Sequence, residues 1–245
     1  MKMTAKLLLC YVTDRRALST PGEMARREEV MRLARAAVGA GVDWVQIREK
    51  DLPTQMLLEL VRQAVAAGAG SSTKILVNDR LDVALAAGAA GVHLGGESMP
   101  VQAVAKWCDR HGRVRAQGGH GFSRAEEEEK EQGALAPEGF VPSDFLVGRS
   151  CHSLDEAQQA ERDGADYVFF GPVFATPSKA QYGPPQGVER LAEVCRALHI
   201  PVIAIGGIGL DNAPECFRAG AAGIAAVRLF QESTDLAASI RQLRK

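Results

Sequence analysis

Polar and charged side chains follow most of the short apolar runs of this 245-residue chain, at the points where the runs end. They are amides, carboxylates, hydroxyls, imidazoles and cations, the groups that bind anions, metal ions and small polar molecules. The carboxyl ends of parallel strands meet at one edge, so these side chains are candidates for one site. After successive runs they are Gln46, Arg48, Glu49 and Lys50; Asn78, Asp79 and Arg80; His93, Glu97 and Ser98; Ser150 and His152; and Thr176, Ser178 and Lys179.

Three of these residues are cations that suit a phosphorylated ligand. Arg48, Lys50 and Lys179 are predicted to converge on the site. A planar guanidinium and two ammonium groups match the oxygens of a diphosphate. The pattern therefore indicates an anionic substrate.

The ends of the last two runs predict a second phosphate-binding region. Gly206 and Gly207 follow the seventh run, where glycine lets backbone N–H groups approach a phosphate closely. The same pair is also typical of a tight turn. The eighth run ends at Val227 and Arg228, which would complete a phosphate cradle common in barrels of this type.

An aspartate and two histidines have competing interpretations. Asp79 can bind Mg²⁺ beside a diphosphate, or it can cap the helix that follows it. His93 is expected to pack in the core. Ser153 is expected to cap a helix with Glu156 as its capping-box partner, which would leave His152 free at the mouth of the site as an acid-base group.

Eight apolar runs alternate with helix-like segments, and this pattern predicts a single-domain α/β protein, a (β/α)8 TIM barrel over residues 1–245. Continuous apolar runs are typical of parallel strands buried on both faces. A doubly wound open sheet is the alternative, but VTDRRA after the first run lacks the phosphate-binding glycines of that fold. The expected strands are LLLCYV, DWVQI, KILV, GVHL, DFLV, DYVFF, PVIAI and GIAAV, and the expected helices are 22–40, 53–68, 80–88, 99–107, 153–163, 187–198, 211–219 and 234–244.

Residues 110–142 break this rhythm and are predicted to form a long mobile loop between the fourth helix and the fifth strand. Its acidic run at 126–129 is expected to be a solvated helix face, because adjacent carboxylates on a helix point in different directions. His111 and His120 in this segment are assigned no chemistry.

Composition argues against several classes of partner. The net charge of −1 gives no basic surface for nucleic acid or membrane binding. Five scattered cysteines without metal-ligand spacing predict reduced thiols and a cytoplasmic location. The first apolar run is too short for a signal peptide or a membrane span. A homodimer is compatible with the predicted scaffold.

Six motifs occur at the ends of the predicted strands in an order that resembles the thiamine phosphate synthase and thiazole tautomerase superfamily. The similarity spans nearly the whole chain outside 110–142. The motifs are QIREK at 46–50, NDR at 78–80, GVHLG at 91–95, GRSCHS at 148–153, FGPVFATPSK at 170–179 and IAIGGI at 203–208.

The resemblance implies a synthase that joins hydroxymethylpyrimidine diphosphate to thiazole phosphate, with Mg²⁺ assisting and pyrophosphate released. Arg48, Lys50 and Lys179 would stabilise the leaving pyrophosphate, and Asp79 would bind Mg²⁺. The implied pyrimidine diphosphate site is Gln46, Ile47, Arg48, Glu49, Lys50, Asn78, Ser150 and Lys179. The implied thiazole phosphate site is Thr176, Pro177, Ser178, Gly207, Val227 and Arg228.

The chain departs from the synthase pattern in three places. Ser98 in GGES replaces the second metal-binding carboxylate, Arg228 replaces a small serine, and the 110–142 segment is long. The sister branch also lacks that carboxylate. Its members aromatise a thiazole carboxylate phosphate by proton transfer, and their acid-base histidine stands at the position of His152 in this chain. A thiazole tautomerase is therefore an alternative function, and a non-catalytic barrel that senses a phosphorylated ligand is a third hypothesis.

Overall fold

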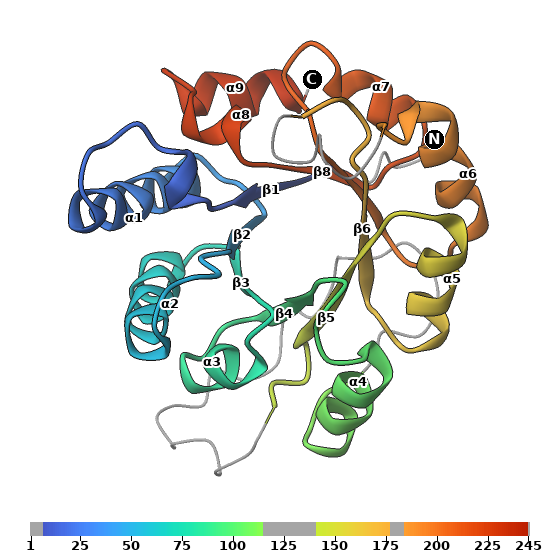
Figure 1. Cartoon of the computed structure of the whole chain (residues 1–245), viewed down its shortest axis with the longest axis horizontal. Helices are drawn as coiled ribbons and strands as arrows, with labels where there is room; N and C mark the ends of the chain where they lie inside the picture. The colour runs from blue at the N-terminus through green and yellow to red at the C-terminus, as the bar shows by residue number, and fades with distance from the viewer. Residues whose placement is uncertain (1–6, 115–140, 177–183, 245) are drawn as a thin grey trace.

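Eight parallel strands form a closed barrel in the computed structural model, which describes residues 7–114, 141–176 and 184–244 (Figure 1). Each strand pairs with the next along the chain, and β1 pairs with β8 to close the sheet. The strands are β1 (Leu8–Val12), β2 (Trp44–Ile47), β3 (Lys74–Asn78), β4 (Gly91–Leu94), β5 (Leu146–Cys151), β6 (Tyr167–Phe170), β7 (Val202–Ile205) and β8 (Gly223–Ala226).

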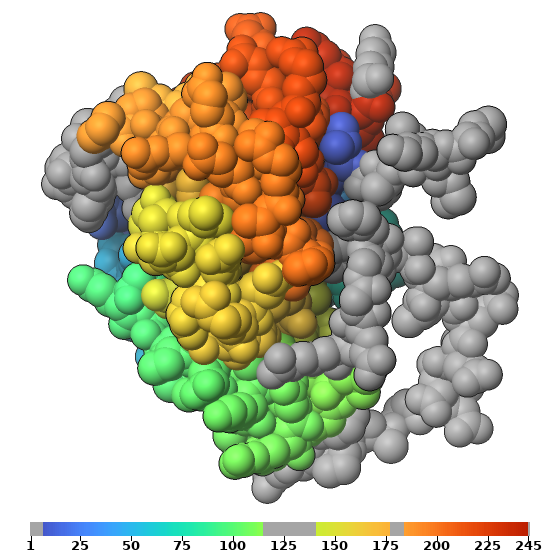
Figure 2. Space-filling view, turned by 90° about the vertical axis from the view of Figure 1, so that its right-hand side faces the viewer, coloured from blue at the N-terminus to red at the C-terminus, as the bar shows by residue number. Residues whose placement is uncertain are grey.

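Helices surround the barrel as an outer ring (Figure 1). Figure 2 shows part of its outer surface, from α4 in green through α5 in yellow to α6 in orange. The helices are α1 (Glu23–Gly39), α2 (Thr54–Gly68), α3 (Leu81–Ala86), α4 (Val101–Arg110), α5 (Leu154–Arg162), α6 (Gly187–Ala197), α7 (Ala213–Arg218), α8 (Arg228–Gln231) and α9 (Leu236–Leu243), with a short 3-10 helix η1 (Arg15–Ala17).

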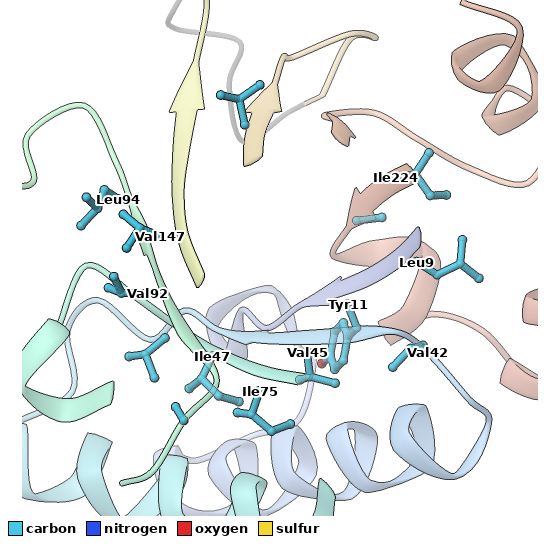
Figure 3. Close-up of a cluster of buried hydrophobic side chains, with 14 of the residues drawn as sticks. Leu9, Tyr11, Val42, Val45, Ile47, Ile75, Val92, Leu94, Val147 and Ile224 are labelled. Atoms are coloured by element: carbon cyan, nitrogen blue, oxygen red, sulfur yellow. The ribbon is translucent and has the colours of Figure 1, made fainter. Parts of the chain in front are cut away.

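Side chains alternate along each strand between two apolar clusters. One cluster lies between the strands and the helices, and Figure 3 shows part of it, including Leu9, Val45 and Ile47. The other fills the barrel interior, as in other closed barrels of this size. Burial on both faces explains why the strands are continuous apolar runs in the sequence. The interior cluster consists of Leu8, Cys10, Val12, Trp44, Leu76, Leu146, Tyr167, Phe169, Ile203 and Ala225.

The predicted fold class is confirmed, but three local predictions are wrong. The fifth strand was expected at 144–147 and runs instead from Leu146 to Cys151, so Ser150 lies within β5 and not after it. The eighth strand ends at Ala226, and Arg228 is the first residue of the unpredicted short helix α8. The N-cap of α3 is Arg80 without a side-chain cap, so Asp79 does not cap that helix. Residues 115–140 of the predicted loop, including the acidic run and His120, lie outside the described residues.

Gly148 in β5 lies beside Tyr167, its register partner in the neighbouring strand β6, whose side chain points into the barrel interior. A Cβ at this position would lie 2.1 Å from Cζ of Tyr167, whose side chain is fully buried. The close approach explains why the upper half of β5 departs from an apolar run.

We expect Gly148→Ala to destabilise the barrel, because the buried ring of Tyr167 must shift to admit the methyl group. The free energy of unfolding should fall by about 3 kcal/mol or more, as measured by urea denaturation. Gly39→Ala is the matched control, since a Cβ there meets nothing within 4 Å. A Gly148→Ala variant as stable as Gly39→Ala would contradict the packing described here.

Candidate active site

Four inward-facing polar residues form a layer above the apolar interior, at the carboxyl ends of β2 to β5. The amide of Gln46 donates to Oδ1 of Asn78 at 3.2 Å, and Nε2 of His93 lies 2.9 Å from Oγ of Ser150. Asn78 and His93 are register partners in adjacent strands. Neighbouring strands therefore bring together side chains that are up to 104 positions apart, from Gln46 to Ser150.

His93 is buried in this layer, as the sequence predicted. Its Nδ1 lies 3.1 Å from the hydroxyl of Tyr167, and its ring packs against Phe169 with centroids 4.2 Å apart. Burial, with smaller contributions from the positive charges of Arg149 and Arg48, lowers the pKa of His93 to about 3. The ring is therefore neutral at physiological pH, and it orients the Ser150 hydroxyl.

Residues 46–50 alternate between the site and the scaffold. Gln46 faces the barrel interior, whereas Ile47 is buried in the cluster beneath the helices. Arg48 is partly exposed, with Nη1 3.8 Å from Oδ2 of Asp14, and Lys50 is exposed. Glu49 is buried between them, and its carboxylate contacts other protein groups.

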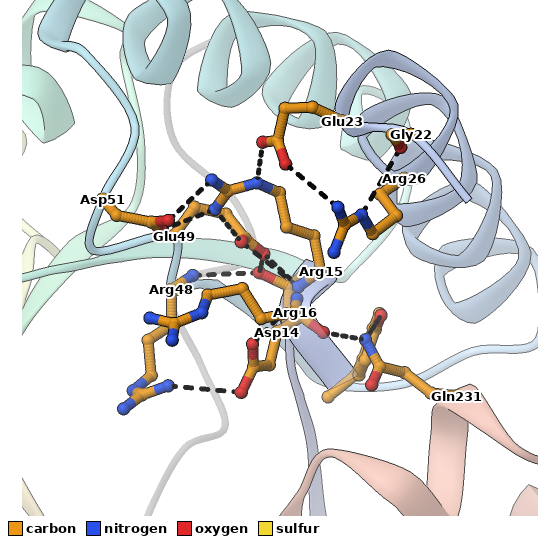
Figure 4. A network of polar contacts seen from close by, with 12 residues as sticks. Asp14, Arg15, Arg16, Gly22, Glu23, Arg26, Arg48, Glu49, Asp51 and Gln231 are labelled. Carbon is orange, nitrogen blue, oxygen red and sulfur yellow. Dashed lines mark hydrogen bonds and ion pairs between the residues drawn. The ribbon is translucent and has the colours of Figure 1, made fainter. Parts of the chain in front are cut away.

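The carboxylate of Glu49 is bound by groups at the end of β1. It accepts hydrogen bonds from the Thr13 hydroxyl at 2.7 Å and from Nη1 of Arg15 at 3.0 Å. The backbone N–H of Arg15 contacts both carboxylate oxygens at 3.2 Å (Figure 4). Burial raises the pKa of Glu49, and the hydrogen bonds from Thr13 and Arg15 oppose that effect.

Asp79 offers one oxygen donor of the kind that Mg²⁺ binds. It is an exposed residue directly after β3, and its backbone adopts the left-handed conformation with φ 68°. Asparagine and aspartate tolerate this conformation better than other non-glycine residues, and such strained positions gather at functional sites. Its N–H donates to the carbonyl of His93 at 2.8 Å, which fixes the backbone.

Ser98 does not supply a second charged donor. Its hydroxyl accepts a hydrogen bond from the N–H of Gly95 at 2.6 Å, so it closes the turn after β4. No group of three or more histidine, cysteine, aspartate or glutamate side chains that could hold a metal ion occurs among the described residues. The donor set therefore fits a Mg²⁺ ion bound by one carboxylate with the remaining ligands from substrate and water.

His152 is less free than the sequence suggested. Ser153 caps α5 through the N–H of Glu156 at 3.2 Å, and the Glu156 carboxylate accepts from the N–H of His152 at 2.7 Å. The predicted Ser153 cap is confirmed, but Glu156 binds the N–H of the residue before the N-cap and not that of Ser153, as a capping box would. The ring Nδ1 of His152, however, contacts the carbonyl oxygen of Gly171, which leaves Nε2 as the nitrogen available to a ligand.

The loops after β6 and β7 pack tightly against each other at the predicted phosphate-binding region. Gly206 and Gly207 both have positive φ, 99° and 66°, and a Cβ on Gly207 would lie 2.5 Å from the carbonyl oxygen of Ala175. The glycine pair thus has the structural role of a tight turn. Val227 is the N-cap of α8 and Arg228 is exposed beside it.

Part of the predicted site cannot be placed. Thr176 is the last described residue after β6, and Pro177, Ser178 and Lys179 lie outside the described residues.

The structure adds three residues that the sequence interpretation missed. Thr13 and Arg15 bind Glu49, and the guanidinium of Arg149 in β5 contacts the carbonyl of Gly95 and lies 3.5 Å from that of Gly96. Thr13 and Arg15 belong to VTDR, directly after the first apolar run, so their position at a strand end was the available signal.

The comparisons with known proteins agree with this architecture. The family described as thiamine monophosphate synthase matches residues 12–134 and 134–230. The chain belongs to this family. A thiamine-phosphate synthase of Anaeromyxobacter dehalogenans is 40% identical over 211 residues, which cover 86% of this chain and 80% of that protein. One of Methanocella arvoryzae is 38% identical over 212 residues, which cover 86% and 84%.

Solved structures support the same assignment. Thiamine phosphate pyrophosphorylase from Pyrococcus furiosus superposes with a TM-score of 0.73 at 30% identity, covering 98% of this chain and 95% of that one. A 3-hexulose-6-phosphate synthase superposes with a TM-score of 0.63 at 17% identity, which shows the shared fold alone. The resemblance to the thiamine phosphate synthase family is confirmed. Within the described part of the chain, no helix has the length and apolar character needed to cross a membrane.

The buried imidazole of His93 should make stability depend on pH. In the folded protein its pKa is about 3, whereas the ordinary value is 6.5, so between these values the unfolded chain binds the extra proton. The free energy of unfolding should therefore fall as the pH decreases from 6.5, by up to about 1.4 kcal/mol per pH unit from this residue.

His93→Gln should flatten this dependence, because glutamine keeps a hydrogen-bonding side chain that does not titrate. Urea denaturation of both proteins between about pH 7 and pH 4 measures the difference. Parallel pH profiles for the two proteins would show that His93 does not carry the effect.

Proposed function

We propose that this protein is a transferase that condenses hydroxymethylpyrimidine diphosphate with thiazole phosphate to give thiamine phosphate and pyrophosphate. The observation that carries the proposal is the polar layer of Gln46, Asn78, His93 and Ser150 at the carboxyl ends of the strands, with Arg48 and Lys50 directly after β2 in the chain. Active sites of (β/α)8 enzymes lie at this end of the barrel. Family membership and the named relatives support the same reaction.

The pyrimidine diphosphate would bind over the ends of β2, β3 and β5. The side chains of Gln46, Asn78 and Ser150 can hydrogen-bond to the pyrimidine or the diphosphate. The buried Oε1 of Gln46 lacks a partner among the described residues, so the layer retains an acceptor for a ligand N–H group. The cations of Arg48, Lys50 and Lys179 would bind the diphosphate oxygens. Ile47 and Glu49 would contribute to this site through their backbone groups, while their buried side chains support the segment.

The thiazole phosphate would bind at the loops after β6 and β7 and at the start of α8. A phosphate site formed by the last two strand-end loops and a short extra helix recurs in barrels of this type. Gly207 lets the backbone approach the phosphate, and Arg228 can pair with it. The remaining residues of this proposed site are Thr176, Pro177, Ser178 and Val227.

Asp79 would hold Mg²⁺ together with oxygens of the substrate diphosphate. When bound, the ion supplies positive charge that stabilises the leaving pyrophosphate. The positive charges of Arg48, Lys50 and Lys179 would stabilise the same developing charge. The thiazole nitrogen attacks the methylene carbon as its bond to the diphosphate oxygen breaks, so the reaction needs no nucleophile from the protein.

A thiazole tautomerase is the second candidate function. Ser98 in place of a carboxylate favours it, and the Nε2 of His152, directed away from the contact that Nδ1 makes with Gly171, would be available for proton transfer. Proton transfer would then use His152 at the end of β5. Arg48 and Lys50 argue for the synthase, since the tautomerase substrate has no diphosphate. The presence of these two cations together with Asp79, His152 and Lys179 argues against a barrel that only senses a ligand.

The deciding experiment is an assay of the purified protein with both synthase substrates, first with Mg²⁺ and then with EDTA. We expect pyrophosphate release with formation of thiamine phosphate, and loss of both in EDTA. Well-folded protein without turnover, together with conversion of a thiazole carboxylate phosphate that His152→Asn abolishes, would establish the tautomerase instead.

Restoring the missing carboxylate should strengthen the dependence on Mg²⁺. In Ser98→Asp, the new side chain can still accept from the N–H of Gly95 while adding a negative donor on the same turn. The Mg²⁺ concentration for half-maximal turnover should fall by about tenfold. Ser98→Asn keeps the acceptor without the charge and should leave that concentration unchanged. An equal response of the two variants would place this turn away from the metal.

Two further parts of the proposal concern location and assembly. All five cysteines are free thiols, which supports a reducing compartment such as the cytoplasm. Met24 on α1 and Met56 on α2 are 71% and 44% exposed on neighbouring helices, which supports a homodimer through this face.

A further inference from the structure

The segment that carries Arg48 and Lys50 is attached to the end of β1 at three points. The N–H of Arg48 donates to the Thr13 hydroxyl at 3.0 Å, and that hydroxyl donates to Glu49 at 2.7 Å. The guanidinium of Arg15 binds Glu49 through Nη1, and it binds Asp51 through Nη1 at 2.7 Å and Nη2 at 2.9 Å. Figure 4 shows the carboxylates of Glu49 and Asp51 both bound to Arg15.

The anchoring carboxylates alternate with the two cations along the chain. Glu49 and Asp51 lie on either side of Lys50, and both bind the same buried guanidinium, so the backbone of Lys50 is fixed from both directions. Arg48 is fixed through its own N–H. Lys50 is exposed and Arg48 is partly exposed, so both cations are accessible to a ligand.

We infer that Arg15, Thr13, Glu49 and Asp51 are positioning residues that hold the backbone of Arg48 and Lys50 for binding of the pyrophosphoryl group. The inference rests on the proposed function and deepens it. Fixing a flexible cation before the ligand arrives lowers the entropy lost on binding, and small displacements of such groups have large effects on rate.

The carboxylates around Arg15 also provide a matched pair of variants. Asp51 belongs to the cation segment, and its side chain is 47% exposed. Glu23, at the start of α1, contacts Nε of the same guanidinium and is 51% exposed, but it lies outside that segment. Asp51→Asn and Glu23→Gln each remove one negative charge from Arg15, and only Asp51→Asn weakens an anchor of Lys50.

The direction of the change in pyrophosphate affinity distinguishes a positioning role of Asp51 from a purely electrostatic one. Removal of a carboxylate near an anion site strengthens anion binding if charge alone matters. We expect the opposite for Asp51→Asn, a loss of about tenfold in affinity for inorganic pyrophosphate with Mg²⁺, measured by isothermal titration calorimetry. Glu23→Gln should change that affinity less than twofold, and thermal unfolding should show both variants folded.

Kinetics provide the second readout. Asp51→Asn should raise the KM for the pyrimidine diphosphate and leave the KM for thiazole phosphate unchanged. Thr13→Val should behave like Asp51→Asn, whereas Thr13→Ser, which retains the hydroxyl, should restore wild-type values. Equal effects of Asp51→Asn and Glu23→Gln, or unchanged pyrophosphate affinity in both Asp51→Asn and Thr13→Val, would overturn the inference.

The two proposals can fail separately. A wild-type protein that binds pyrophosphate with this pattern of variants but does not form thiamine phosphate would refute the synthase and keep the positioning role. A wild-type protein that forms thiamine phosphate, with Asp51→Asn and Thr13→Val variants of unchanged pyrophosphate affinity, would keep the synthase and refute the positioning role.

Discussion

The buried contact between Glu49 and Arg15 joins the ends of β1 and β2, and the basic side of the proposed site is built on it. A carboxylate taken out of water loses several kcal/mol of hydration, which only well-aligned donors offset. Thr13 and Arg15 supply these donors from side chain and backbone. Loss of Arg15 would leave the buried carboxylate of Glu49 without a cation, so this contact holds the ends of the two strands in one arrangement.

Other strand ends of the barrel also hold polar side chains in fixed positions. Parallel strands place every second side chain inward, and from β2 to β5 the last inward side chain is polar. Below that layer the interior is filled by large apolar groups such as Trp44 and Tyr167, whose ring centroids are 4.7 Å apart. The polar layer therefore rests on a packed floor that restricts its rotamers. Preorganisation of this kind is what electrostatic stabilisation of a leaving group requires.

Much of this arrangement could be predicted from the sequence, because both determinants are local patterns. Eight apolar runs specify the strands, and polar residues directly after them specify the site. The direction of a side chain was not predictable in the same way. Glu49 lies between two site cations in QIREK but is buried, since its direction depends on contacts with Thr13 and Arg15 about 35 positions away. The upper half of β5 was missed because its residues are not part of an apolar pattern. Gly148 leaves room for the ring of Tyr167, Arg149 contacts the turn at 95–96, and Ser150 bonds to His93.

The turn that carries Ser98 is held by contacts within the protein, and serine can stand there in place of a carboxylate. The Ser98 hydroxyl accepts from Gly95, and Arg149 contacts the carbonyls of Gly95 and Gly96. These contacts lie within the protein, so the turn does not depend on a metal ion for its conformation. A carboxylate at position 98 would add a negative charge to this turn without a change in its backbone conformation. Because a diphosphate itself offers several oxygens to Mg²⁺, the proposed metal site would need only one protein carboxylate, that of Asp79, and a second carboxylate would raise the affinity for the ion.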